Sequence, residues 1–383
     1  ESLIKRARSS DAIVAATRLC LLSAQSSFAD GMREERNTFL NLKNGNQSAA
    51  LRYVAYAEKE VSNRPDIPVS KARPVQKVGV IGAGTMGAGI AVACLDSGYD
   101  VTIIETLQEG LQLGRERVDA IFNRYVASGR ITPDAKDARL SRLFFSTNLD
   151  SLRDADLVIE AVFENFDVKS ALLKELEVRL RPDCIFATNT SYLDINLLGK
   201  SLKDSSRFVG LHFFSPANLM KLLEIVRADR TAVDVLATSF VFCQKLNKVA
   251  VLSGVCDGFI GNRILTRYRA QCEFMLEEGA LPYEIDQALE AYGFAMGPFA
   301  VSDLAGLDIS WARRKSLALT RNPAERYVPL ADMICEMGRF GQKTGTGWYR
   351  YQEGKKQRDP EIDALVKAHG KASGWPQKSF TAE

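Results

Sequence analysis

The sequence predicts an α/β fold in which a doubly wound, mostly parallel sheet is followed by an all-α domain. Short apolar runs alternate with helical patterns from Lys77 to about Leu252, as they do when helices join the strands of a parallel sheet. A glycine-rich turn follows the first apolar run, and after Gly258 the pattern becomes purely helical. These three observations predict the order of the two main domains.

The residues before the sheet are expected to be helical and then extended. Residues 1–62 are rich in Ala, Leu, Ser and charge, and the pattern predicts helices over 11–26 and 47–61, separated by a polar break at 41–46. Residues 63–75 contain three prolines and read as an extended linker.

The apolar runs and helical patterns place the remaining elements. Strands are expected at 78–81, 101–105, 157–162, 184–188, 207–211, 222–226 and 248–252. Helices are expected at 259–278, at 283–292 and in a long stretch after Pro298. The boundaries that follow are 76–256 for the sheet domain and 257–351 for the helical domain, with a charged, linker-like tail over 352–383.

Composition excludes several classes of protein. Fifty basic and 47 acidic residues give a net charge of +3 with no basic tract, which argues against nucleic acid as the main partner. Seven scattered cysteines without CxxC spacing indicate reduced thiols and no zinc site. No apolar run reaches the ~18 residues that would span a membrane, and no signal-peptide pattern is present. The chain begins at Glu1 without a methionine, so we expect a fragment of a longer protein.

The turn after the first apolar run has the spacing of a dinucleotide site. Gly82, Gly84 and Gly87 form GxGxxG: the first allows a tight turn, the second a close approach of a pyrophosphate, and the third close packing of helix on strand. The N-terminus of the following helix attracts phosphate. Glu105 ends the next apolar run, where a carboxylate binds the adenosine ribose and repels a 2′-phosphate. The segment therefore predicts a Rossmann-type domain that prefers NAD to NADP.

A histidine and a glutamate are the candidates for acid–base chemistry. His212 follows a predicted strand, at the sheet edge where ligands of open α/β folds bind. Glu224 lies within the apolar run 222–226, where a buried carboxylate needs a partner, and His212 is a candidate. Two plainer readings stay open: His212 satisfied locally at a strand end, and Glu224 facing solvent.

A set of motifs in fixed order carries a family resemblance. The motifs are DLVIEAVFEN, TNTSYLDI, HFFSPANLMKLLEIV, GFIGNRIL, MGPFAVSDLAGLD and GRFGQKTGTGWY. Over residues 76–350 the chain resembles the 3-hydroxyacyl-CoA dehydrogenases, and is most similar to the dehydrogenase part of multifunctional fatty-acid β-oxidation enzymes. The resemblance implies oxidation of (S)-3-hydroxyacyl-CoA to 3-ketoacyl-CoA with NAD and without a metal.

The resemblance also implies roles for single residues. His212 would be the general base and Glu224 would orient it, while Ser191 and Asn262 would hydrogen-bond the substrate oxygen. Without the motifs, Ser191 reads as a helix cap and Asn262 as a surface residue.

Four further residues would line the cofactor. They are Met86, Glu164, Lys169 and Ser215, and Ser191 would contact the cofactor as well as the substrate. For Lys169 a solvated lysine in the first helical turn is an open alternative, and Ser215 departs from the Asn that many relatives carry there.

The resemblance extends to the flanks of the chain. Residues 1–62 are similar to the terminal helices of an enoyl-CoA hydratase/isomerase module, whose catalytic glutamates would lie upstream, so no hydratase activity is expected. Residues 352–383 would lead to a second helical domain. Without that domain an apolar face would be exposed, so we expect a homodimer through residues 259–340 or weakened activity.

The sequence leaves alternatives open for the cellular location and for the function. The multifunctional relatives imply either the bacterial cytoplasm or the peroxisomal matrix. A hydroxy-acid dehydrogenase independent of coenzyme A and a catalytically silent NAD-binding relative remain alternative functions.

Overall fold

The computed structural model describes residues 10–380, and the chain divides into two compact units, with the boundary between Ile260 and Gly261. The first unit contains an eight-stranded sheet in the order β3-β2-β1-β4-β5-β6-β7-β8, and every neighbouring pair is parallel except β6 and β7. The strands are β1 Lys77–Ile81, β2 Asp100–Ile104, β3 Leu143–Ser146, β4 Leu157–Glu160, β5 Ile185–Thr188, β6 Phe208–Phe213, β7 Leu222–Val226 and β8 Val249–Ser253. The predicted α/β fold class is confirmed.

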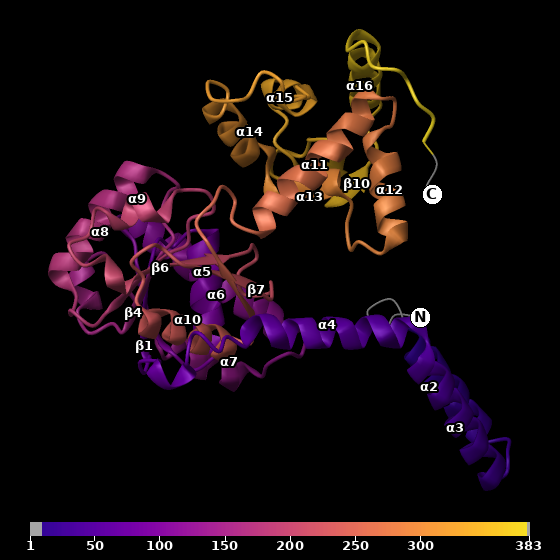
Figure 1. Ribbon diagram of the computed structural model, residues 1–383, viewed down its shortest axis with the longest axis horizontal. Coiled ribbons are helices and arrows are strands. Elements are labelled where there is room, and N and C mark those ends of the chain that lie inside the picture. The colour runs from indigo at the N-terminus through magenta and orange to yellow at the C-terminus, as the bar shows by residue number, and fades with distance from the viewer. Residues whose placement is uncertain (1–9, 381–383) are drawn as a thin grey trace. The chain divides into compact units, whose positions relative to one another are not determined.

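Helices cover both faces of this sheet (Figure 1). On one face α5 Thr85–Asp96, α6 Gln108–Ala127 and α10 Val233–Lys245 form one apolar core with the strands, and α7 Pro133–Leu140 packs beside α5 and α6. On the other face α8 Phe166–Arg179 and α9 Ile195–Gly199 form a second core. The sheet is therefore doubly wound, and the carboxyl ends of its first six strands share one edge.

The sequence analysis missed strand β3. Its four residues lie at the sheet edge, and Phe144 is 57% exposed. A short, half-exposed edge strand lacks the buried run that identified the other strands.

The helices before the sheet differ from expectation. They are α2 Ser10–Ser23, α3 Phe28–Asn44 and α4 Asn46–Ser62, and α3 was not predicted. Ser27 caps α3 by accepting the N–H of Asp30, and Thr38 is the one buried side chain in that helix. Phe28, Met32 and Phe39 recur at helical spacing, but they are mostly exposed and lie among charged residues, which concealed this helix. The expected break at 41–46 shrinks to Gly45.

The proline-rich segment 63–75 belongs to the first unit and is held against its core at Ile67 and Arg73. Arg73 donates its backbone N–H to Thr238 Oγ1 at 2.8 Å and its guanidinium to Asp234 Oδ2 at 2.7 and 2.8 Å. Ile67 is buried in the same core as the sheet.

The second unit is mainly helical, as predicted. It contains α11 Gly261–Glu277, α12 Pro282–Tyr292, α13 Pro298–Ala305, α14 Leu307–Ser316, α15 Leu330–Glu336, the hairpin β9 Arg350–Gln352 with β10 Lys355–Gln357, and α16 Pro360–Ala372. Two buried aspartates hold separate segments of this unit together. Asp303 accepts the N–H groups of Trp348 and Tyr349, and Asp286 accepts those of Phe299 and Ala300.

The expected linker at 352–383 needs correction. Helix α16 lies inside it and buries Ile362 and Val366 in the core of the second unit. Pro360 occupies the first helical turn, where proline is favoured, and Asp359 caps the helix. The spacing i, i+4 of the two buried residues is the signal that the charged composition concealed.

Candidate active site

The glycine turn after β1 has the geometry that its sequence predicts. Gly82 has a φ of +100°, a conformation that favours glycine. A Cβ on Gly87 would lie 1.8 Å from the carbonyl oxygen of Gly82, so only glycine allows α5 this close to the turn. A Cβ on Gly84 would meet nothing within 4 Å. The second glycine therefore faces open space of the kind that a pyrophosphate would need.

The acid after β2 is bound to this turn. Glu105 accepts the N–H of Ala83 at 3.0 Å and the N–H of Thr106 at 2.8 Å. Burial acts to raise the pKa of Glu105, but these hydrogen bonds outweigh it and hold the pKa below its usual value. The carboxylate is thus ionised and fixed beside the turn, which fits a dinucleotide ribose at this position.

His212 and Glu224 form a buried pair. They lie opposite each other on the antiparallel strands β6 and β7, with 2.7 Å between His212 Nδ1 and Glu224 Oε2. Exposed fractions of 3% and 0% rule out the solvent-facing reading of Glu224. No hydrogen bond from the described residues occupies His212 Nε2, so the carboxylate fixes one ring nitrogen and leaves the other for proton transfer.

Glu164 organises the loop that carries Ser191. Its Oε1 accepts the hydroxyl of Thr190 at 2.5 Å and the N–H groups of Ser191 and Tyr192 at 2.8 and 3.2 Å. These donors follow β5, whereas Glu164 follows β4, so the carboxylate joins two neighbouring strand ends.

Lys169 is not the solvated lysine of the alternative reading. It is 1% exposed, and its Nζ lies 2.8 and 2.9 Å from the two oxygens of Glu160 and 3.3 Å from Glu164 Oε2. Burial raises the pKa of Glu160, while Lys169 and the Thr188 hydroxyl act in the opposite direction. The ammonium group is therefore enclosed by carboxylates of this chain.

The other predicted residues lie in separate surroundings. Met86 is partly buried on the glycine turn's helix, and Ser215 is exposed just after β6. Asn262 belongs to α11 of the second unit, where its carbonyl accepts the Thr266 hydroxyl. The structure therefore brings Glu105, the glycines, Glu164, Ser191 and His212 to one edge of the sheet, and leaves Asn262 to a different unit.

Sequence reasoning missed several polar residues at this edge. Glu160 and Thr188 are the final residues of β4 and β5, and Asn189 Oδ1 accepts the N–H of Phe213 at 2.8 Å. The signal was a polar residue closing an apolar strand, since such residues gather at the carboxyl edge.

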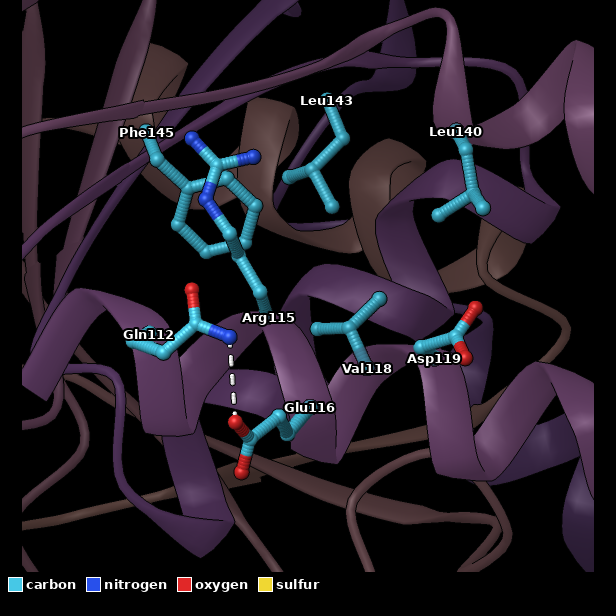
Figure 2. Close-up of a pocket in the computed structure, with 8 residues that line it drawn as sticks. All are labelled: Gln112, Arg115, Glu116, Val118, Asp119, Leu140, Leu143 and Phe145. Carbon is cyan, nitrogen blue, oxygen red and sulfur yellow. Dashed lines mark hydrogen bonds between the residues drawn. The ribbon is translucent and has the colours of Figure 1, made fainter.

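A hollow away from the carboxyl edge of the sheet is lined by residues of α6, α7 and β3 (Figure 2). It has a volume of about 380 Å³ and is formed by α6, the end of α7 and β3, with the Arg115 guanidinium 4.2 Å from the centre of the Phe145 ring. None of the predicted site residues lines it. Within residues 10–380, no helix is long and apolar enough to cross a membrane, and no group of three or more His, Cys, Asp or Glu side chains could hold a metal.

Comparison with known families matches both units. Residues 77–256 match the NAD binding domain of 3-hydroxyacyl-CoA dehydrogenase, and residues 258–351 match its C-terminal domain. Together the two matches cover well over half of the chain.

Known relatives agree with the family models. The chain is 40% identical to a peroxisomal bifunctional enzyme of Cavia porcellus over 87% of this chain and 49% of the relative, and 36% identical to the Homo sapiens enzyme of that name over 92% and 51%. It thus spans about half the length of these relatives.

Solved structures show the same likeness. (S)-3-hydroxybutyryl-CoA dehydrogenase from Ralstonia eutropha is 33% identical, with a TM-score of 0.68 over 73% of this chain and 100% of that chain. The dehydrogenase part of multifunctional enzyme 1 from C. elegans is 30% identical, with a TM-score of 0.60 over 81% and 70%. The chain therefore belongs to the 3-hydroxyacyl-CoA dehydrogenase family and has that family's NAD binding domain and C-terminal domain.

Proposed function

We propose that the chain oxidises (S)-3-hydroxyacyl-CoA to 3-ketoacyl-CoA with NAD, as a step of fatty-acid β-oxidation. The observation that carries the proposal is the buried pair of His212 and Glu224 at the edge of an NAD binding domain. The 3-hydroxybutyryl-CoA dehydrogenase of Ralstonia eutropha, matched over its full length, supports the coenzyme A thioester class.

In this proposal His212 takes the proton of the 3-hydroxyl group through Nε2. Glu224, on Nδ1, keeps that nitrogen protonated and stabilises the imidazolium that forms. NAD supplies the chemistry of hydride acceptance when bound. Ser191, held by Glu164, would hydrogen-bond the substrate oxygen, as would Asn262 from the second unit.

Several residues of the sheet edge would hold the cofactor. The glycine turn (Gly82, Gly84, Gly87) would accommodate the pyrophosphate and Glu105 the ribose, with Met86 and Ser215 beside the dinucleotide. Because Lys169 is enclosed by Glu160 and Glu164, it would serve the cofactor side by holding the Glu164 carboxylate in place.

The test is NADH oxidation with acetoacetyl-CoA by the wild type and by a His212→Gln variant. We expect kcat to fall about 10²- to 10⁴-fold in the variant, because in this reducing direction His212 is the acid that gives its proton to the forming 3-hydroxyl group, while NADH still binds. His369→Gln is the matched control: it removes the only other histidine, which pairs with Glu277 at 3.0 Å in the second unit, and should keep turnover.

Substrate controls separate the alternatives. Turnover of acetoacetate equal to that of acetoacetyl-CoA would indicate a dehydrogenase independent of coenzyme A. NADH binding with no turnover of either would indicate a silent relative. NADPH should be a poor substitute, because Glu105 would repel its 2′-phosphate.

We also propose self-association through the second unit. Its exposed apolar side chains include Ile264, Tyr292, Ile309 and Leu319, with exposed fractions of 65%, 84%, 67% and 98%, and apolar groups that gather into one exposed patch mark a surface for association. A monomer at all concentrations in sedimentation, together with full turnover, would contradict this proposal.

The names of the relatives favour a peroxisomal matrix location, which co-fractionation with a peroxisomal marker would test.

A further inference from the structure

The segment that closes the first unit has an unusual backbone. After β8 the chain turns through Gly258, with a φ of +69°, and Phe259, with a φ of +47°. Within residues 10–380, three non-glycine residues have a positive φ, and the other two, Asn247 and Glu353, are exposed polar residues. A buried aromatic residue in this region is a real outlier, so the surrounding structure must hold it there.

The outlying conformation places two groups against the catalytic pair. The Phe259 ring is 1% exposed, and its centre lies 5.6 Å from that of the His212 imidazole. The next residue, Ile260, directs its N–H to Glu224 Oε1 at 3.0 Å. One turn of backbone thus contacts both members of the pair.

The hydrogen bond from Ile260 matters because the bond between His212 and Glu224 does not by itself set the orientation of the carboxylate plane. Glu224 Oε2 holds His212 Nδ1, and a carboxylate held at a single oxygen can still rotate about its terminal bond. The Ile260 N–H binds the other oxygen and so contributes to fixing the carboxylate plane. A hydrogen bond of this kind orients a group one step removed from the chemistry.

We propose that Phe259 is a positioning residue for the reaction, acting through Glu224, and this inference rests on the dehydrogenase function proposed above. Its ring anchors the turn in the apolar core around β5 and β6, and the turn presents the Ile260 N–H to the carboxylate. Gly261, the next residue, begins the second unit, so the same turn ties the pair to the covalent junction of the two units.

The test compares Phe259→Leu with Phe186→Leu. Phe186 is equally buried in the same core and has no part in the proposed site, so its variant measures the general cost of losing a ring. We expect Phe259→Leu to lower kcat about 10- to 100-fold with an unchanged KM for NADH, the effect of a small misplacement of a catalytic group. Phe259→Met serves the same comparison if the leucine variant does not fold.

A Glu224→Gln background distinguishes positioning from packing. If Phe259 acts through the carboxylate, Phe259→Leu should cost less than about threefold in that background, because coupled residues are not additive. Phe186→Leu should cost the same factor in both backgrounds. Equal losses for the two phenylalanine variants, or a Phe259→Leu loss that is undiminished in the Glu224→Gln background, would overturn the proposal.

A spectroscopic measurement needs neither substrate nor cofactor. The chain has two histidines, so His369→Gln leaves the His212 ring as the only imidazole in a ¹⁵N NMR spectrum. In alkaline buffer the wild type should show a single tautomer with the proton on Nδ1, whereas Phe259→Leu and Glu224→Gln should show mixed tautomers. A single tautomer retained in Phe259→Leu would refute positioning. An inactive wild type would instead refute the proposed function and leave this result to be judged separately.

Discussion

The two glycines of the turn after β1 predict opposite effects of one chemical change, the addition of a methyl group. At Gly87 the new Cβ would lie 1.8 Å from the Gly82 carbonyl oxygen, whereas real Cβ atoms keep at least about 3 Å, so α5 or the turn must move by more than 1 Å. Overpacking against backbone costs roughly 3 kcal/mol, and the helix preference of alanine returns roughly 1 kcal/mol. Gly87→Ala should therefore lose about 2 kcal/mol of stability.

At Gly84 the same methyl group meets no atom of the protein. Its φ of −67° and ψ of −173° suit alanine, so Gly84→Ala should gain about 0.5 kcal/mol by restricting the unfolded chain. The methyl group would instead occupy the space into which a pyrophosphate must come. We expect the Kd for NADH to rise at least about tenfold, which corresponds to about 1.4 kcal/mol.

The assay pairs urea unfolding, followed by far-ultraviolet circular dichroism, with titration of NADH fluorescence. The expected pattern is a Gly84→Ala variant that is at least as stable as the wild type but binds NADH poorly, and a Gly87→Ala variant with a lower unfolding midpoint. Wild-type NADH affinity in Gly84→Ala would refute the assignment of this turn to the pyrophosphate. An unchanged midpoint in Gly87→Ala would refute the steric argument.

Two further predictions concern buried charges. Lys169→Met should lower the free energy of unfolding by about 3–5 kcal/mol, because it leaves Glu160 buried without its cation. Lys174→Met, at an exposed site on the same helix, should change that free energy by less than about 0.5 kcal/mol. Equal urea midpoints for the two variants would contradict the buried pair. Burial raises the pKa of Asp303 from 3.8 to about 6, so between these pH values the folded state binds one more proton than the unfolded chain. The stabilisation that this proton gives to the folded state is fully present below about pH 4 and is lost as pH rises through 6. The free energy of unfolding should fall by about 3 kcal/mol at most, and this pH dependence should vanish in Asp303→Asn. Tryptophan fluorescence can follow the unfolding, because all three tryptophans of the chain lie in the second unit.

The sequence was informative wherever function required a local pattern. GxGxxG and the acid 18 residues later place each group within one strand–helix–strand unit, so the spacing alone predicted their geometry. His212 and Glu224 were paired because a charge within an apolar strand needs a partner, and the antiparallel register of β6 and β7 puts them opposite each other. That β7 runs against β6 was not predictable from composition, since both orientations bury the same apolar run.

The sequence was less informative where burial depends on distant residues. Helix α3 buries only Thr38 and is polar in composition, and the burial of α16 depends on Leu276 and its neighbours, about 90 residues away in the chain. Phe259 gave no signal, because a left-handed backbone at a bulky residue is imposed by the packing around it rather than by its own preference.

Lys169 and Glu164 show why assigning one ligand to each residue falls short. The sequence analysis placed both beside the cofactor, and Ser191 beside substrate and cofactor. In the structure Glu164 Oε1 takes three donors from the Ser191 loop, and Oε2 lies 3.3 Å from the Lys169 ammonium. An ionised carboxylate has about four acceptor positions, so Oε2, on a side chain 38% exposed, keeps capacity for a further donor. The charge that would meet the cofactor therefore also holds the substrate loop, and loss of the Lys169 cation should disturb both. Such a link follows only from the adjacency of β4 and β5, which brings together residues 26 to 28 positions apart.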